Sequence, residues 1–253
     1  MTTPAMGKLP EITFVFWIMK ICATTLGETA GDLLSMTLNV GYAASSLILI
    51  SVFLATLAAQ LRAATFLPSL YWSAILLTST AGTTLSDYLN RTVGLGYMRG
   101  ALLLVSLLSA VFVFWRFALG SLSVQDIRTR RVELVYWIAI LVSNTLGTSL
   151  GDFLADDSGL GFAGGALLIA AGLALTVVAH YFTSTSKVLL FWVAFVLTRP
   201  FGATMGDVPT KSHERGGLDL GTVGSSLVLL SILVVFVVYT SRAQLDFANA
   251  RAR

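Results

Sequence analysis

The sequence predicts an all-α, polytopic membrane protein with eight transmembrane helices, arranged as four parallel two-helix repeats with pseudo-symmetry about the membrane normal. Of its 253 residues, 56% are hydrophobic and only 11% are charged, and the mean hydropathy is +0.83. A soluble domain of this length would need more polar surface. Long apolar stretches also recur along the chain, and one short motif is repeated four times. These observations together predict the fold class.

The apolar stretches have the length of membrane-spanning helices. A helix of about 20 residues crosses about 30 Å of hydrocarbon. We expect one transmembrane domain, residues 1–253, with internal repeats at about 12–62, 69–117, 133–183 and 187–242. The eight spans are expected at about 12–33, 41–61, 69–89, 96–117, 133–154, 161–182, 187–207 and 221–241.

Each repeat contains a tryptophan, a glycine ten residues later and an aspartate five residues after the glycine. The same offset of 120 residues separates the first and third tryptophans and the second and fourth, which indicates a duplicated two-repeat unit. Because each repeat holds two spans, all four enter the membrane from the same side. The motif residues are Trp17, Gly27 and Asp32; Trp72, Gly82 and Asp87; Trp137, Gly147 and Asp152; and Trp192, Gly202 and Asp207.

Basic residues are concentrated at the termini and between repeats. Ten lie there, against four in the loops within repeats, so both termini are expected on the cytoplasmic side of the inner (plasma) membrane. The aspartates then lie toward the opposite, acidic face. The basic residues are too dispersed for phosphate binding, which argues against a nucleic-acid partner. The ten are Lys8, Arg62, Arg116, Arg128, Arg130, Arg131, Lys187, Arg242, Arg251 and Arg253; the four are Arg91, Arg99, Lys211 and Arg215.

The repeated motif brings oxygen-bearing side chains into apolar sequence. Its four copies read TTLGETAGD, STAGTTLSD, NTLGTSLGD and RPFGATMGD. If the glycines break the first helix of each repeat, backbone carbonyls, hydroxyls and carboxylates can converge on one cavity. Close helix packing is the other explanation for the small residues. The expected helix-break glycines are Gly27, Gly82, Gly147 and Gly202, and the hydroxyl residues expected along an ion pathway are Thr29, Thr84, Ser149 and Thr204.

Carboxylates, hydroxyls and carbonyls are the ligands of hard cations such as Mn, Mg, Ca, K and Na. Four equivalent aspartates on one acidic face suggest such a site, although helix capping or an interfacial position would also explain them. The expected metal ligands are Glu28, Asp32, Asp87, Asp152 and Asp207, and Asn144 joins the expected pathway.

Three charges break the fourfold pattern. Glu28, Lys20 and Arg199 each stand where the other repeats have uncharged residues. A charge within a span is costly unless it is paired or hydrated, so each is a candidate functional residue. Arg199 is a plausible partner of Glu28 or Asp32, and such a pair could serve transport or could only hold repeat 4 against repeat 1.

The four motifs, each with its tryptophan, resemble a bacterial membrane protein family defined by a four-times-repeated, two-span unit of unknown function. The resemblance covers about residues 15–241. It implies eight spans in an inner membrane and favours a role in metal handling. Repeat 4 departs most from the pattern, with Arg199 and Pro200 before its glycine and a longer loop after its aspartate.

These patterns predict a secondary transporter of a small cation, preferably a divalent metal such as manganese, which would be substrate rather than resident cofactor. A pseudo-tetrameric channel and a non-transporting scaffold or sensor are the alternatives. No catalytic motif stands out, so no enzyme activity is expected; a membrane-embedded enzyme would have to use Glu28 with Lys20 or Arg199. The expected partners are the lipid bilayer and the cation, and the oligomeric state is open, a homo-oligomer included.

Overall fold

The computed structural model describes residues 9–252, apart from the side chains of residues 215 and 243–252. Lys8 and Arg253, and the side chains of Arg215 and Arg251, which entered the count of basic residues, therefore lie outside the description. Within residues 9–252 the regular structure is helical. Its eight long helices are α1 (Phe14–Asp32), α2 (Tyr42–Arg62), α3 (Pro68–Asp87), α4 (Tyr97–Phe114), α5 (Arg130–Asp152), α6 (Gly161–Phe182), α7 (Lys187–Thr210) and α8 (Thr222–Ala252).

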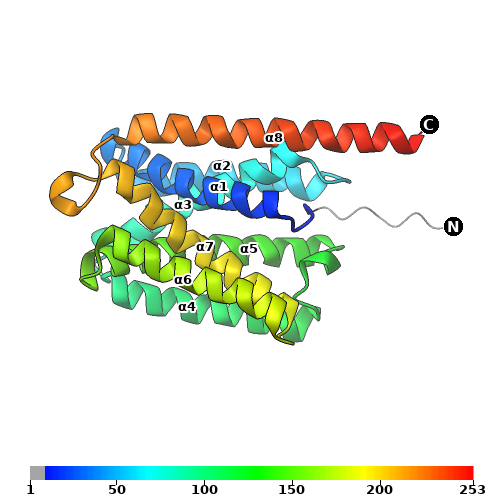
Figure 1. Ribbon diagram of the computed structural model, residues 1–253, viewed down its shortest axis with the longest axis horizontal. Coiled ribbons are helices and arrows are strands. Elements are labelled where there is room, and N and C mark those ends of the chain that lie inside the picture. Colours follow the sequence, from blue (N-terminus) through cyan, green and yellow to red (C-terminus); the bar gives the residue numbers. More distant parts are fainter. Residues whose placement is uncertain (1–8, 253) are drawn as a thin grey trace.

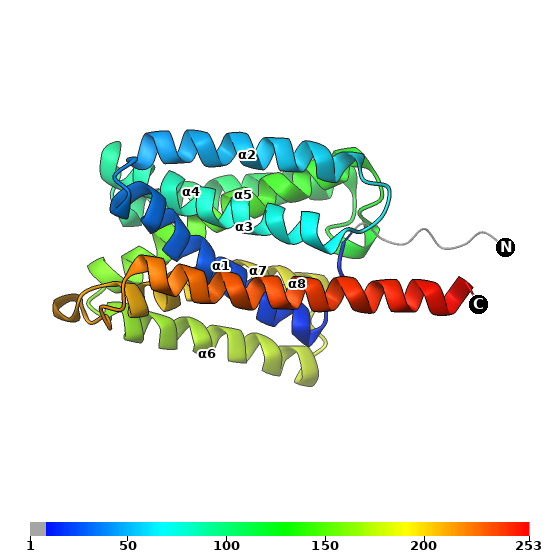
Figure 2. The same ribbon diagram turned by 90° about the horizontal axis from the view of Figure 1, so that it is seen from above.

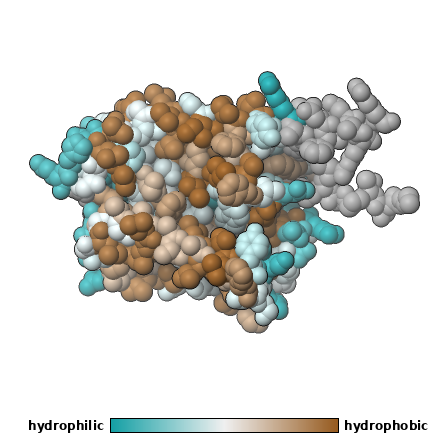
Figure 3. Space-filling model, viewed as in Figure 1, coloured by the Kyte–Doolittle hydropathy of each residue, from teal (hydrophilic) through white to brown (hydrophobic). Residues whose placement is uncertain are grey.

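Six of the helical segments described are long and apolar enough to cross a membrane. They contain α2, α4, α5, α6, α7 and α8. The two long helices that do not meet this criterion, α1 and α3, carry many polar residues, and these are buried against other helices. Figure 3 shows a wide apolar band between more hydrophilic ends. The chain is therefore a polytopic helical membrane protein.

Local sequence explains where the helices begin. The Thr13 hydroxyl accepts a hydrogen bond from the backbone N–H of Phe16 at the start of α1, and Thr129 caps α5 in the same way. Pro68 occupies the first turn of α3, where it removes no helical hydrogen bond. A glycine with positive φ lies at the start of the second helix of every repeat, at Gly41, Gly96, Gly161 and Gly221. Only glycine adopts that backbone conformation without strain, so it allows the chain to reverse.

The first helices of the repeats form the centre of the molecule. Helices α1, α3, α5 and α7 pack in a ring, and each second helix packs on the first helix of the next repeat: α2 on α3, α4 on α5, α6 on α7 and α8 on α1. Figures 1 and 2 show the loops within repeats at one end, here named the turn end, and the loops between repeats at the other, here named the termini end. The four repeats are parallel, as the sequence predicts.

An aromatic belt closes the ring at the termini end. The aromatic residue that precedes each motif tryptophan contacts the motif tryptophan of the next repeat, and repeat 4 contacts repeat 1 in the same way. The four pairs are Phe16–Trp72 with 5.6 Å between ring centroids, Tyr71–Trp137 with 5.6 Å, Tyr136–Trp192 with 6.1 Å and Phe191–Trp17 with 5.8 Å. The cyclic order of these contacts establishes the fourfold pseudo-symmetry of the inner helices.

The motif glycines do not break the helices. Each inner helix is continuous through its glycine, contrary to the expected break at Gly27, Gly82, Gly147 and Gly202. Each glycine instead lies against a residue of the next repeat, the one three positions before that repeat's glycine. These residues are Ser79, Asn144, Arg199 and Thr24 in turn. A Cβ atom at Gly82, for example, would lie 2.9 Å from the carbonyl carbon of Asn144. The glycines thus allow close approach of neighbouring helices, which keep their backbone hydrogen bonds inside the membrane.

The helical pattern changes after the aspartate rather than at the glycine. In repeats 1 to 3 the inner helix continues directly into a π-helical turn, at Leu33–Thr37, Tyr88–Thr92 and Phe153–Asp157. In repeat 4 the α-helix runs on to Thr210. Such π turns are frequently found at functional sites, and here they directly follow three of the four motif aspartates, Asp32, Asp87 and Asp152.

Candidate functional site

A column of charged side chains runs along the axis between the inner helices. Lys20, Thr24, Glu28 and Asp32 are spaced by four on α1 and therefore lie on one face of that helix. All four are buried, as is Arg199 of α7. The column therefore extends from Lys20, about two turns from the start of α1, to the aspartates at the turn end.

Arg199 and Glu28 form a buried ion pair in the middle of the column. Nη1 of Arg199 lies 3.0 Å from Oε2 of Glu28, and neither residue is more than 3% exposed. Nη2 of Arg199 donates to the Thr83 and Thr148 hydroxyls at 2.6 Å each and to the carbonyl oxygen of Ser79 at 3.2 Å. The two threonine hydroxyls in turn donate to Oε2 of Glu28. Of the two partners expected for Arg199, Glu28 or Asp32, the structure shows Glu28. This pair and its threonine partners connect all four inner helices across the axis.

Lys20 lies closer to the termini end and has neutral partners. Its Nζ is 3.5 Å from the amide oxygen of Asn144 and 4.1 Å from the centre of the Phe195 ring. The Asn144 amide group donates to the Thr78 hydroxyl at 2.9 Å. A cation–π contact and one long hydrogen bond are modest compensation for a fully buried ammonium group.

The four motif aspartates are joined in two pairs by cations that follow them. Nζ of Lys211 lies 3.1 Å from Asp207, four residues earlier on α7, and 2.5 Å from Asp32 of α1. The guanidinium group of Arg91 lies 2.9 Å from Asp87, also four residues earlier, and 4.0 Å from Asp152. In each case the cation of an even-numbered repeat joins its own aspartate to that of the next repeat.

Lys211 lies outside the membrane-spanning segments and is nearly buried, with 14% of its side chain exposed. Burial by itself lowers the pKa of its ammonium group, but the carboxylates of Asp207 and Asp32 outweigh burial, so the pKa is raised above the usual value for lysine. Lys211 is therefore a fixed positive charge near neutral pH, held among carboxylates.

Three carboxylates around Lys211 have the spacing of a cation site. Glu28, Asp32 and Asp207 each offer an oxygen, and these oxygens lie within 4.8 Å of one another. Oxygens that bind one Mg, Mn or Ca ion at about 2.0–2.6 Å are at most about 5 Å apart, so the three could bind one ion together. The other two expected ligands, Asp87 and Asp152, lie in the pair joined by Arg91.

The four expected hydroxyl residues bond away from the carboxylates. Thr84 accepts a hydrogen bond from Ser46 of α2 at 3.0 Å, and Thr29 accepts one from Ser226 of α8 at 2.9 Å. Ser149 bonds to Ser86 and Asn90 at 2.8 and 2.7 Å. Thr204 donates to the carbonyl oxygens of Pro200 and Phe201 on its own helix. The hydroxyls of Thr84, Thr29 and Ser149 therefore join neighbouring helices, whereas that of Thr204 bonds within α7.

Four residues of the column escape the sequence reasoning. Arg91 and Lys211 count there only as loop charges, although each follows a motif aspartate by four residues, the spacing that places both on one helix face. Thr83 and Thr148, which bond to both Arg199 and Glu28, are two of the uncharged residues that stand at the position of Glu28 in the other repeats. Their position one residue after the glycine, level with Glu28, is the signal that could have identified them.

The comparisons with known proteins agree with the repeat architecture. The family model described as Repeat of Unknown Function (DUF347) matches residues 15–66, 70–120, 135–186 and 190–246. Searches of curated proteins and of solved structures give no match. The four matches begin near the motif tryptophans and together cover most of the chain. The chain therefore belongs to the DUF347 repeat family.

Proposed function

We propose that the protein is a secondary transporter of a small, hard cation, with a divalent metal such as manganese preferred. The observation that carries the proposal is the group of Glu28, Asp32 and Asp207, whose oxygens lie within 4.8 Å of one another at the turn end of the column. Carboxylate oxygens suit Mg, Ca and Mn. Ionisable residues inside a membrane domain typically mark ion pathways.

Lys211 gives this site a built-in counter-ion. Its ammonium group forms ion pairs with both Asp32 and Asp207, so a metal ion that binds there must displace it. Lysine suits such an exchange because it is a compact point charge on a flexible chain. In our proposal the metal enters from the turn end, takes the place of the Lys211 ammonium and gains Glu28 as a further ligand.

The proposal favours a carrier over a channel. The Arg199 guanidinium crosses the axis between Glu28 and two threonines, and the Tyr71 and Tyr136 hydroxyls meet 2.8 Å apart within the aromatic belt. A cation on the axis would have to pass a fixed positive charge and a layer of packed rings. Passage therefore requires rearrangement of helices, as in a carrier with alternating access.

The membrane placement follows from charge and length. We infer that α1 and α3 also span the membrane, for a total of eight passes, because they pack in parallel with α5 and α7. By the positive-inside rule, the basic residues between repeats favour a cytoplasmic position for the termini end. The carboxylate group then faces the outside of an inner (plasma) membrane.

Flux measurements in proteoliposomes test the proposal. The purified full-length protein is reconstituted, and uptake of Mn²⁺, Mg²⁺, Ca²⁺, K⁺ and Na⁺ is compared with that of protein-free liposomes. We expect saturable flux that is greatest for a divalent ion. Asp32→Asn and Asp207→Asn should each remove most of it, because each deletes one carboxylate of the site.

Asp157→Asn is the matched control. Asp157 is also an acidic residue at the turn end, but it is exposed, so its loss changes surface charge without altering the buried carboxylates. Flux should be retained in this variant. Absence of flux for every ion from protein that remains monodisperse, or unchanged flux in both site variants, would overturn the proposal and favour a scaffold or sensor.

A further inference from the structure

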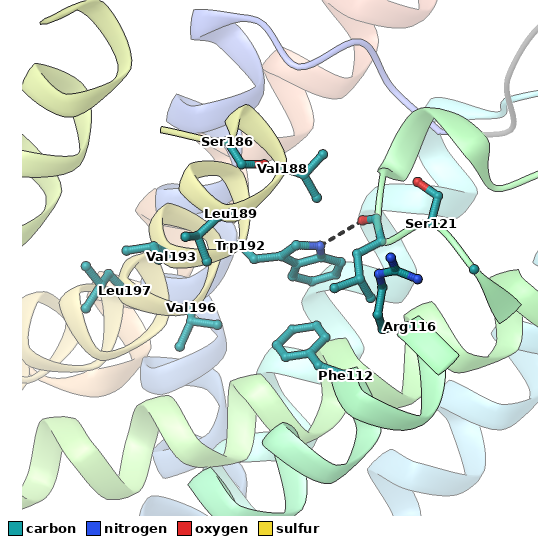
Figure 4. Close-up of a pocket in the computed structure, with 12 residues that line it drawn as sticks. Phe112, Arg116, Ser121, Ser186, Val188, Leu189, Trp192, Val193, Val196 and Leu197 are labelled. Carbon is teal, nitrogen blue, oxygen red and sulfur yellow. Dashed lines mark hydrogen bonds between the residues drawn. The ribbon is translucent and has the colours of Figure 1, made fainter. Parts of the chain in front are cut away.

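An apolar groove lies on the outside of the molecule, away from the axial column. It occupies about 960 Å³ and is lined by α4, by α7 and by the segment that connects α4 to α5. Figure 4 shows Val193, Val196 and Leu197 of α7 on one side of it, with Phe112 of α4 and the Trp192 indole between the helices. Because α4 packs on α5 and α6 packs on α7, part of α7 is left uncovered between them.

The floor of the groove is fixed by packing. The rings of Phe112 and Trp192 are in edge contact, with centroids 4.8 Å apart. The Trp192 indole N–H donates to the carbonyl oxygen of Leu122 at 3.0 Å. With its ring held from both sides, Trp192 cannot turn to fill the space, and the groove is a preformed site within the size range of ligand pockets.

The length of the groove corresponds to one leaflet of a bilayer. It extends along α7 from Ser186, the residue just before the helix, to Leu197. These residues are eleven positions apart, so the groove runs about 16 Å along the axis at 1.5 Å per residue. That is about half of a 30 Å hydrocarbon core, the depth to which one lipid acyl chain reaches.

The mouth of the groove carries a cation and hydroxyl groups. Arg116, Ser121 and Ser186 line it, at the end of the apolar span Tyr97–Leu119 and just before α7. This is the level at which lipid headgroups lie. Arg116 is exposed, and arginine binds phosphate through two parallel hydrogen bonds. The termini end also carries most of the basic residues, which favours anionic lipid there.

We propose that this groove binds one anionic phospholipid, with its phosphate at Arg116 and an acyl chain along Val193, Val196 and Leu197. The apolar wall, the length of a half-bilayer and the single cation at the mouth each match one part of such a lipid. The proposal is independent of cation transport, because none of these residues belongs to the axial column.

Native mass spectrometry of the purified full-length protein in detergent tests the site. The probes are phosphatidylglycerol and phosphatidylcholine with identical acyl chains, and glycerol 1-phosphate without acyl chains. We expect phosphatidylglycerol to bind about five- to tenfold more tightly than phosphatidylcholine, and glycerol 1-phosphate not to bind. Equal binding of the two lipids, or equal binding of the acyl-free probe, would overturn the proposal.

Two variants and one control locate the lipid. Arg116→Gln should abolish the preference for phosphatidylglycerol, and Val193→Trp should reduce binding of both lipids because the larger ring fills the groove. Both residues are exposed, so the fold should tolerate the changes. Arg62→Gln is the control, since Arg62 is an exposed arginine at the end of α2 outside the groove. An equal loss in the Arg62 variant would contradict the assignment. If the protein dimerises and Val193→Trp abolishes the dimer, the groove binds a second copy of the chain rather than a lipid.

Discussion

The joint between α7 and α1 and the joint between α3 and α5 occupy equivalent places in the ring but are built from different chemistry. At the α3–α5 joint, neutral groups face each other: Asn144 donates to Thr78 at 2.9 Å, and Ser86 bonds to Ser149 at 2.8 Å. At the α7–α1 joint, the central contact is the buried ion pair of Arg199 with Glu28.

The cations at the turn ends of the two joints also differ in their chemistry. Arg91 bridges Asp87 and Asp152 with a guanidinium group that stays charged in any protein, whereas Lys211 bridges Asp207 and Asp32 and has Glu28 nearby. The side chains that α3 and α5 present directly to each other at the centre are thus neutral, so close packing of two inner helices in this ring needs no ion pair between them. Because buried ion pairs are poor sources of stability, the charges of the α7–α1 joint are better explained by function.

Loss of Arg199 should have the largest effect. Arg199→Leu leaves the Glu28 carboxylate buried without a cation, and we expect it to lower the free energy of unfolding by about 3–5 kcal/mol. Thermal unfolding of the purified protein in detergent measures the loss. The double variant Glu28→Thr with Arg199→Thr places threonines where other repeats have them, at Thr83 and Thr24. It should recover most of the stability but none of the cation flux.

That double variant distinguishes the two explanations of the ion pair. Stability as low as that of the single variant would make the pair a structural tie between repeats 4 and 1. Recovered stability together with full transport would remove the pair from the mechanism. Both results would weaken the contrast between the two joints.

Variants that lack one or the other bridging cation should differ in how far added metal restores their stability. Lys211→Met leaves Asp207 and Asp32 unpaired and should lower stability by about 1.5–3 kcal/mol. Added Mn²⁺ should restore the melting temperature, because three oxygens there lie within 4.8 Å of one another. Arg91→Met is the matched variant at the other joint, where two aspartates alone were joined, and Mn²⁺ should restore less. Equal restoration in the two variants would argue that the joints are equivalent.

Glycine variants should affect both joints alike, because the packing frame is shared. A Cβ atom would lie 2.9 Å from the backbone carbonyl carbon of Asn144 at Gly82, and 2.9 Å from that of Thr24 at Gly202. Gly82→Ala and Gly202→Ala should therefore each cost about 1–3 kcal/mol of overpacking strain. Gly224→Ala in α8 is the control, since nothing lies within 4 Å of its Cβ position, and it should cost nothing measurable. A large difference between the first two variants would mean that the frames are not equivalent.

The sequence was sufficient for the fourfold repeat, and it limited the expected partner of Arg199 to Glu28 or Asp32. Period, hydropathy and unmatched charges are properties of single segments, so they can be read without a structure. The expected helix break was wrong because the sequence does not show which neighbouring helix approaches each glycine. Asn144 fills the space at Gly82 from another repeat, and only the cyclic packing of the repeats determines that contact.

The bridging cations were missed for a related reason. Arg91 and Lys211 lie in segments that hydropathy assigns to loops, and a count of loop charges ignores their register with the preceding aspartate. The structure continues the helix past Asp87 as a π-helical turn and past Asp207 as α-helix, which carries each cation back over the carboxylates. The hydroxyl residues were assigned to the pathway by residue type. The direction in which each hydroxyl points, however, depends on which side of its helix the next repeat occupies.

The smallest expected effect is that of Ser149→Ala, which tests the neutral joint directly. It removes the hydrogen bonds to Ser86 and Asn90 and should cost about 1 kcal/mol, well below the loss for Arg199. Because this hydroxyl bonds between α5 and α3 rather than to a carboxylate, the flux of any transported cation should be unchanged. Thr204→Val is the control, since Thr204 bonds only to carbonyl oxygens of its own helix among the contacts described. A fall in flux for Ser149→Ala without a fall in stability would return that hydroxyl to the ion pathway, and the α3–α5 joint would then share the function assigned to α7–α1.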